Sequence, residues 1–147
     1  MLRSARTRFA AGALILVAMA TAAACGSSPS AQARACTGKA HLQTSLDQLR
    51  NFDYATGSAS ALAADLDSAR KGLVGVEAAV HLPQNTGLQQ LGGVGRIRQL
   101  ENEMRTLGAA VKASGTSGGS PQLASFENAV RQRTTEMQQI AGAVTGC

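Results

Sequence analysis

The sequence predicts an all-α fold, and two features of its hydrophobic pattern lead to this prediction. Apolar residues recur at intervals of three and four in four separate segments, the spacing that places side chains on one face of an α-helix. No segment alternates apolar and polar residues over the length of a strand. Because the connections between the four segments are short, we expect one domain with the architecture of an antiparallel up-down-up-down four-helix bundle.

Residues 1–24 have the three parts of an export signal peptide. A basic start, which contains Arg3, Arg6 and Arg8, precedes an uncharged apolar run that ends in three alanines. This run of about 15 residues is too short to span roughly 30 Å of hydrocarbon as a helix. We therefore expect a cleaved signal peptide rather than a retained membrane anchor.

Cys25 stands at the predicted cleavage point, after three alanines and before a Gly/Ser-rich stretch. The run Ala22-Ala23-Ala24-Cys25 resembles the lipobox of bacterial lipoproteins. That resemblance implies that Cys25 receives a diacylglyceryl thioether, with N-acylation by a fatty acid such as palmitate, and holds the protein on the outer face of the cell membrane. The family usually has Leu or Val where Ala22 stands, and the same alanines fit an ordinary secretory cleavage site. Secretion without lipid is therefore the alternative.

The number of cysteines favours the lipoprotein interpretation. Three cysteines in an exported chain leave one without a partner. If Cys25 carries lipid, Cys36 and Cys147 remain as an even pair. An up-down-up-down bundle brings the start of its first helix and the end of its last helix together, so we predict a Cys36–Cys147 disulfide. Such a bond closes a loop of about 110 residues, worth roughly 4–5 kcal/mol in the chain-entropy model.

The mature chain divides into a tether and a helical domain. Residues 25–35 are small and polar, and they predict a flexible tether. Residues 36–147 are enough for one modest hydrophobic core. The first helix is expected from about Thr37 to Phe52, with Leu42, Leu46 and Leu49 facing inward.

The second helix has the strongest pattern. Ser58 is the expected N-cap, and Pro83 is expected to end the element. Between them the apolar residues are spaced 4, 3, 4, 3 and 4 apart on one face: Leu62, Leu66, Ala69, Leu73, Val76 and Val80.

The third and fourth helices have weaker boundaries. The third is clearest from Ile97 to Val111, but its start near Leu88 is uncertain, because each glycine in residues 92–95 costs a helix about 1 kcal/mol relative to alanine. The fourth is expected to begin with Ser120 as N-cap and Pro121 at the first helical position. Its apolar stripe contains Leu123, Phe126, Val130, Met137, Ile140 and Val144.

Charge and aromatic content argue against nucleic-acid and carbohydrate binding. The whole chain has a net charge of +5, but without residues 1–24 it has 11 basic and 9 acidic side chains, or +2. So small a net charge does not indicate a binding surface for a polyanion such as nucleic acid. The remaining aromatic residues are Phe52, Tyr54 and Phe126, with no Trp to stack on bases or sugars. Arg96 and Arg133 are interpreted as parts of solvated helix faces.

No residue pattern predicts catalysis or a cofactor. His41 and His81 are expected near one end of the bundle, but two histidines without a placed carboxylate are an incomplete metal-ligand set. Residues 92–95 lack the strand or Lys-Ser/Thr of a phosphate-binding loop. The acidic pairs Asp65/Asp67 and Glu101/Glu103 are two residues apart, which places their members on different helix faces, and solvated surface is the simpler interpretation.

Three functions remain as hypotheses. The first is a non-enzymatic envelope lipoprotein with a structural role or an envelope protein partner. The second is a carrier of a small ligand or lipid in a cavity between the helices. The third, an enzyme, has no motif to support it. The Ala- and Gly-rich composition, together with the lipobox, resembles that of small envelope lipoproteins of actinobacteria.

Overall fold

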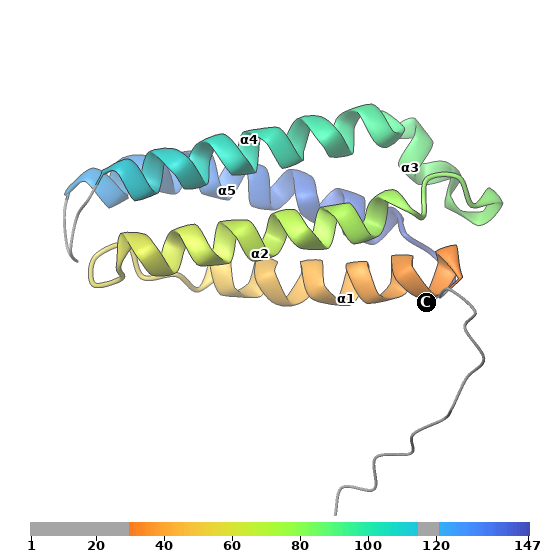
Figure 1. The fold of residues 1–147 in the computed structure, drawn as a ribbon, viewed down its shortest axis with the longest axis horizontal. Coiled ribbons are helices and arrows are strands. Elements are labelled where there is room, and N and C mark those ends of the chain that lie inside the picture. The colour runs from red at the N-terminus through yellow and green to blue at the C-terminus, as the bar shows by residue number, and fades with distance from the viewer. Residues whose placement is uncertain (1–29, 115–120) are drawn as a thin grey trace, which may run out of the picture.

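The fold is all-α, as the sequence predicts. The computed structural model describes residues 30–114 and 121–147, and it contains no strand in those ranges. The helices are α1 (Ala31–Arg50), α2 (Ala59–Glu77), the 3₁₀ turn η1 (Pro83–Asn85), α3 (Thr86–Gln90), α4 (Gly93–Ala113) and α5 (Pro121–Ala143). The four long helices lie alongside one another, and the short α3 lies at one end of the molecule (Figure 1). The signal peptide, Cys25 and the predicted cap Ser120 lie outside the described residues.

Helix α1 begins six residues before the predicted start at Thr37. The Ser30 hydroxyl caps the helix by accepting a hydrogen bond of 3.1 Å from the Ala33 amide. Ala35 is then fully buried in the core. The prediction of a flexible tether over residues 25–35 is therefore wrong for residues 31–35. Alanine is the strongest helix former, and the small residues that suggested a linker extend the helix instead.

Helix α2 confirms the strongest prediction. The Ser58 hydroxyl accepts a hydrogen bond of 3.2 Å from the Ala61 amide, and η1 begins at Pro83. The residues of its predicted apolar face are buried, with at most 4 % of each exposed: Leu62, Leu66, Ala69, Leu73, Val76 and Val80. The helix itself ends at Glu77, six residues before Pro83, so Val80 lies in the turn that follows it.

A break at Gly92 and Gly93 resolves the uncertain start of the third predicted helix. The backbone φ angles there are +100° and +57°, in the left-handed region that glycine adopts without strain. The chain therefore ends α3 at Gln90 and starts α4 in a new direction. From this point α4 keeps the predicted register, with Ile97 and Val111 buried.

Helix α2 lies between α1 and α4, and α5 packs against α1 and α4 (Figure 1). The approach of α1 to α2 is very close, because Gly38 faces Gly75 and Gly72 faces Leu42. From α5 and the residue that follows it, the core receives apolar side chains of the predicted stripe: Leu123, Val130, Met137, Ile140 and Val144. Across residues 30–114 and 121–147, no helix is both long and apolar enough to cross a membrane.

Candidate functional site

The predicted Cys36–Cys147 disulfide is present and closes one end of the molecule. It joins the second turn of α1 to the residues that follow α5, with a Cα–Cα distance of 5.4 Å. Cys147 is exposed and Cys36 is partly buried. Figure 1 shows the last residue beside the start of α1. The bond therefore ties the first and last described helices together.

Amide side chains surround this disulfide. The Gln32 Nε2 donates to the Gly146 carbonyl at 2.9 Å, and the Gln84 Nε2 donates to the Gln32 Oε1 at 2.6 Å. The Lys39 Nζ donates to the Val144 carbonyl at 2.7 Å. Residues 144–147 are thus held by side chains from α1 and η1 as well as by the covalent bond.

Asn85 is the buried link in the same region. Its side chain is fully buried, and its Nδ2 donates to the Ala79 carbonyl at 3.1 Å. Its Oδ1 accepts from the Thr145 amide at 2.7 Å and from the Thr145 hydroxyl at 2.9 Å. A buried amide with these partners joins the turn after α2 to the C-terminal residues. Sequence analysis did not predict this role for Asn85, because it took Asn85, close behind Pro83, only as part of the loop that ends the second helix.

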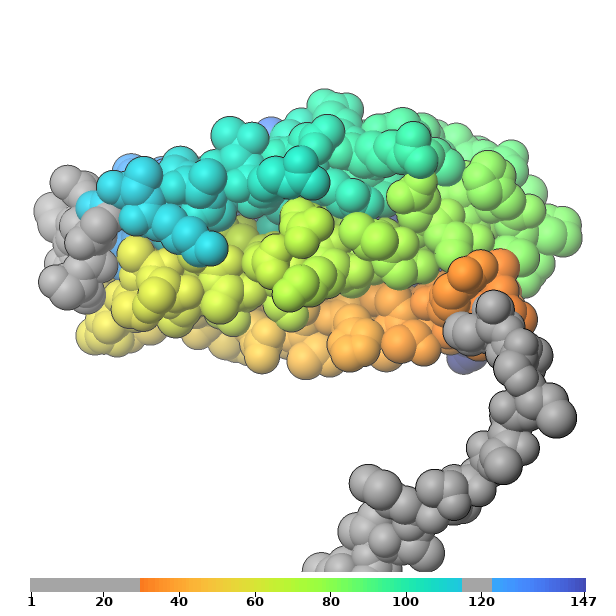
Figure 2. Space-filling model, viewed as in Figure 1, coloured from red at the N-terminus to blue at the C-terminus, as the bar shows by residue number. Residues whose placement is uncertain are grey.

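A groove between α1 and α2 contains both histidines. It has a volume of about 730 Å³, with small residues such as Gly75 and Ala78 in its lining. Figure 2 shows the boundary between α1 and α2 along one face of the molecule. His41 lies near the middle of α1, because this helix begins earlier than predicted, and His81 lies just after α2.

The groove does not assemble a metal site. The one carboxylate in its lining belongs to Glu77, whose Oε1 lies 2.8 Å from the guanidinium of Arg98. In the part of the chain that the structure describes, no three His, Cys, Asp or Glu side chains are grouped to hold a metal ion. What distinguishes the groove is positive charge.

The cations of this groove differ in how they are paired. Arg34, His41 and His81 line it, and their side chains form no ion pair or hydrogen bond with the described residues. The Lys71 Nζ lies 2.9 Å from the Asp67 Oδ2, and the hydrogen bonds from Lys71 and Arg70 lower the pKa of Asp67. Sequence analysis missed Arg34 as a lining residue because it placed Arg34 in the tether. It missed Lys71 because the pattern of one helix does not show which residues of a second helix it faces.

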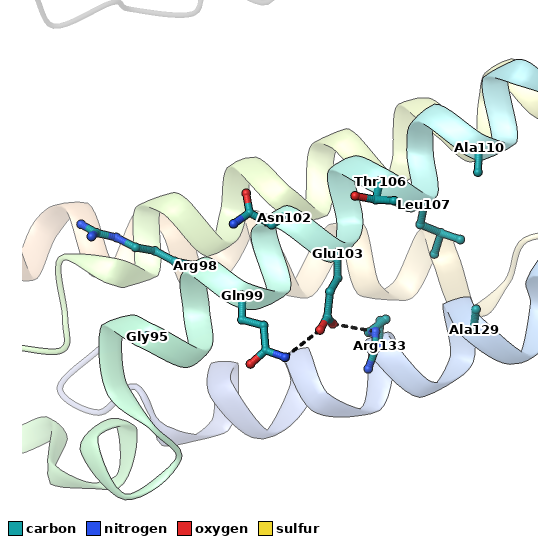
Figure 3. Close-up of a pocket in the computed structure, with 10 residues that line it drawn as sticks. All are labelled: Gly95, Arg98, Gln99, Asn102, Glu103, Thr106, Leu107, Ala110, Ala129 and Arg133. Atoms are coloured by element: carbon teal, nitrogen blue, oxygen red, sulfur yellow. Dashed lines mark hydrogen bonds and ion pairs between the residues drawn. The ribbon is translucent and has the colours of Figure 1, made fainter.

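A second groove, of about 710 Å³, lies between α4 and α5 (Figure 3). Here the charges are paired. The Glu103 carboxylate lies 2.8 Å from the Arg133 Nε and accepts a hydrogen bond of 2.9 Å from the Gln99 Nε2. Glu136 pairs with Arg96 and also with Arg133. The solvated-face interpretation of Arg96 and Arg133 is therefore wrong, since both form partly buried pairs between helices.

The predicted acidic pair Glu101/Glu103 does not converge on one site. Glu103 lines the groove between α4 and α5, whereas Glu101 experiences the charges of Glu77 and Arg70 on α2. Burial and the nearby Glu77 raise the pKa of Glu101, whose Oε1 is buried without a hydrogen-bond partner. The two side chains are partly buried rather than fully solvated, but they point to different neighbours, as their spacing predicts. Paired acid/base chemistry needs convergent carboxyl groups.

These features define a small all-α domain, closed by one disulfide, with a cationic groove and a charge-paired groove on its surface. No protein-family model, curated protein or solved structure matches the chain.

Proposed function

We propose that this chain is a lipoprotein of the bacterial cell envelope, anchored through lipid at Cys25 to the extracytoplasmic face of the membrane. Its helices form an antiparallel up-down-up-down four-helix bundle with a non-enzymatic role, either structural or in binding another envelope protein. Residues 1–24 act as the signal peptide.

The observation that supports the anchor most directly is the pairing of sulfur atoms. The chain has three cysteines, and Cys36 and Cys147 are bonded to each other. Cys25 is the third cysteine, for which the chain offers no further cysteine as a partner, and it is also the one that lies in the lipobox-like sequence. An exported chain tends not to keep a free thiol. A thioether to lipid removes that thiol.

The position of the first described helix supports an orientation for the bundle. Five residue steps separate Cys25 from Ser30, so this stretch reaches at most about 18 Å. The start of α1 lies at the disulfide-bonded end. An anchor at Cys25 therefore keeps that end near the membrane and leaves the loop around Tyr54, at the far end of α1, directed outward.

A non-enzymatic role is favoured by the pairing of the groove carboxylates. Glu103 and Glu136 are bound to Arg133, and Glu77 is bound to Arg98. A general base or a metal ligand needs an available carboxylate. These ion pairs use their carboxylates to join helices, as expected of a scaffold.

Intact-mass analysis of protein extracted from membranes tests the anchor. We expect a mature chain that begins at Cys25, with the added mass of a lipid, and loses two hydrogens relative to the reduced form because of one disulfide. The variant C25S should leave the membrane fraction, and the matched double variant C36S/C147S should stay in it. A mature chain that begins elsewhere, or that lacks lipid, would overturn the proposal. Cleavage without lipid would indicate secretion, and an uncleaved chain would indicate a retained membrane anchor.

A carrier function is the second candidate, and the groove between α4 and α5 favours it. Its volume of about 710 Å³ lies within the range of small-molecule sites, and Leu107, Ala110 and Ala129 give it an apolar part (Figure 3). Native mass spectrometry of protein purified from the envelope tests it. A retained small molecule would support the carrier, and protein at its bare mass would exclude it.

A further inference from the structure

The groove between α1 and α2 combines an apolar floor with a cationic rim. Its floor exists because Gly38 and Gly75 bring the two helix backbones together, so no side chain fills the space above them. Val74, also in the lining, leaves 48 % of its surface exposed. Arg34 and Lys71 lie around this floor together with His41 and His81. Such a combination fits an amphiphile with a negative headgroup.

Charge complementarity selects the occupant. Arg34 has no acidic partner in the described chain. The acidic side chains nearest to the groove already form ion pairs with other basic residues. Asp67 binds both Arg70 and Lys71, and Glu77 binds Arg98. Glu101 adds a third carboxylate near Arg70 and Arg98. The excess of positive charge that no described carboxylate balances is therefore that of Arg34.

The position of the groove along the chain indicates where a negatively charged occupant would come from. The lining begins at Ala33, three residues after Ser30, so the groove opens at the end of the domain that lies nearest to Cys25. A lipid at Cys25 would hold this end within about 18 Å of the headgroups of the bilayer. Basic side chains so close to an anionic membrane surface attract it.

We propose that the groove between α1 and α2 binds the headgroups of anionic phospholipids in the membrane that anchors the chain. This inference rests on the proposed lipid anchor for its geometry. It assigns the α1/α2 face to the membrane and leaves α4 and α5 available to a partner.

Vesicle flotation of the mature C25S chain, residues 25–147, tests the groove apart from the anchor, since this protein has neither the thioether lipid nor the basic and apolar signal peptide. We expect it to float with vesicles of phosphatidylcholine and phosphatidylglycerol and not with phosphatidylcholine alone. The double variant R34Q/K71Q should bind roughly thirtyfold more weakly, or about fivefold for each cation. Added salt should weaken the binding of C25S to the vesicles, and it should have less effect on the binding of the R34Q/K71Q variant.

The matched control is K112Q/R131Q, which removes the same charge elsewhere. Lys112 is exposed and unpaired in the described chain, like Arg34, and Arg131 forms an i,i+4 ion pair, like Lys71. We expect this control to bind like C25S alone. If both double variants lost vesicle binding equally, net charge alone would explain the binding, and the proposal would be overturned.

Two further results would also overturn it. One is equal flotation with vesicles that lack phosphatidylglycerol. The other is release of the protein by inorganic phosphate, but not by chloride at the same ionic strength, which would identify a site for free phosphate. Because none of these measurements uses lipid at Cys25, failure of the groove leaves the anchor standing. A mass that excludes lipid at Cys25 would instead refute the anchor.

Discussion

Gly38 on α1 and Gly75 on α2 meet backbone to backbone. A Cβ atom built on Gly38 would lie 2.5 Å from the carbonyl carbon of Gly75, and one built on Gly75 would lie 2.6 Å from the Cα of Gly38. Among the amino acids, glycine alone lets two helix backbones approach so closely, because it has no Cβ atom. This contact sets the separation of α1 and α2, and it also leaves the space that becomes the cationic groove.

The variant G38A is therefore expected to be less stable by about 1–3 kcal/mol, because the neighbouring atoms are backbone and cannot rotate away. Urea unfolding followed by circular dichroism measures this loss. The matched control is G142A in α5, where an added Cβ meets nothing within 4 Å. That control should be unchanged or more stable by up to about 1 kcal/mol. Equal stability of the two variants would show that α1 and α2 are not in close contact.

The Cys36–Cys147 disulfide should contribute much of the stability of so aromatic-poor a domain. It joins residues 111 positions apart, and closure of a loop of about this length is worth roughly 4–5 kcal/mol in the chain-entropy model. The double variant C36S/C147S should lose about that much free energy of unfolding, whereas C25S should lose none. Reductant should destabilise C25S and leave C36S/C147S unaffected. A reductant effect on C36S/C147S would contradict the pairing.

Asn85 should matter more than its place in a loop indicates. In N85A the Ala79 carbonyl and the Thr145 amide would lose their buried partner, at a cost of about 2 kcal/mol or more. Hydrogen exchange at the Thr145 amide should accelerate as residues 144–147 loosen. N128A, at an exposed position of α5, is the control. Its free energy of unfolding should change by no more than about 0.5 kcal/mol, and exchange at the Thr145 amide should stay the same. If exchange at the Thr145 amide were unchanged in N85A, Asn85 would not be what holds residues 144–147 in place.

Sequence patterning predicted the elements whose signal is local. The buried face of α2 follows from the spacing of its leucines, and its start follows from the Ser58 hydroxyl. The start of α1 was missed because residues 31–35 contain no large apolar side chain. A run of small residues fits a linker and a helix equally well until the burial of Ala35 decides between them.

The cationic groove could not be predicted, because it depends on which residues of two helices face each other. Periodicity places Gly38 and Gly75 on their own helices but does not pair them. The ion pair between Glu103 and Arg133 is hidden for the same reason, since the two residues lie on α4 and α5. The disulfide was predictable from topology together with cysteine number, which needs no knowledge of side-chain packing.

Tyr54 offers a test of the core near the far end of α1. Burial, together with the nearby negative charge of Glu127, raises the pKa of Tyr54 to about 12, and its hydroxyl is buried without a hydrogen-bond partner. Tyr54 is the one tyrosine of the chain, so its ultraviolet titration is free of overlap. We expect a midpoint near pH 12 in the folded protein and near the usual value of about 10 in denaturant.

The sign of the effect on stability follows from this shift in the pKa of Tyr54. The folded state disfavours tyrosinate, so the free energy of unfolding should fall as the pH rises above about 10 and level off above the folded midpoint. In Y54F this fall should be absent, and stability at neutral pH should be equal or slightly higher, because no unsatisfied hydroxyl stays buried. Titration of native Tyr54 near pH 10 would instead mean that its ring is exposed to water and that the loop after α1 does not pack on α5.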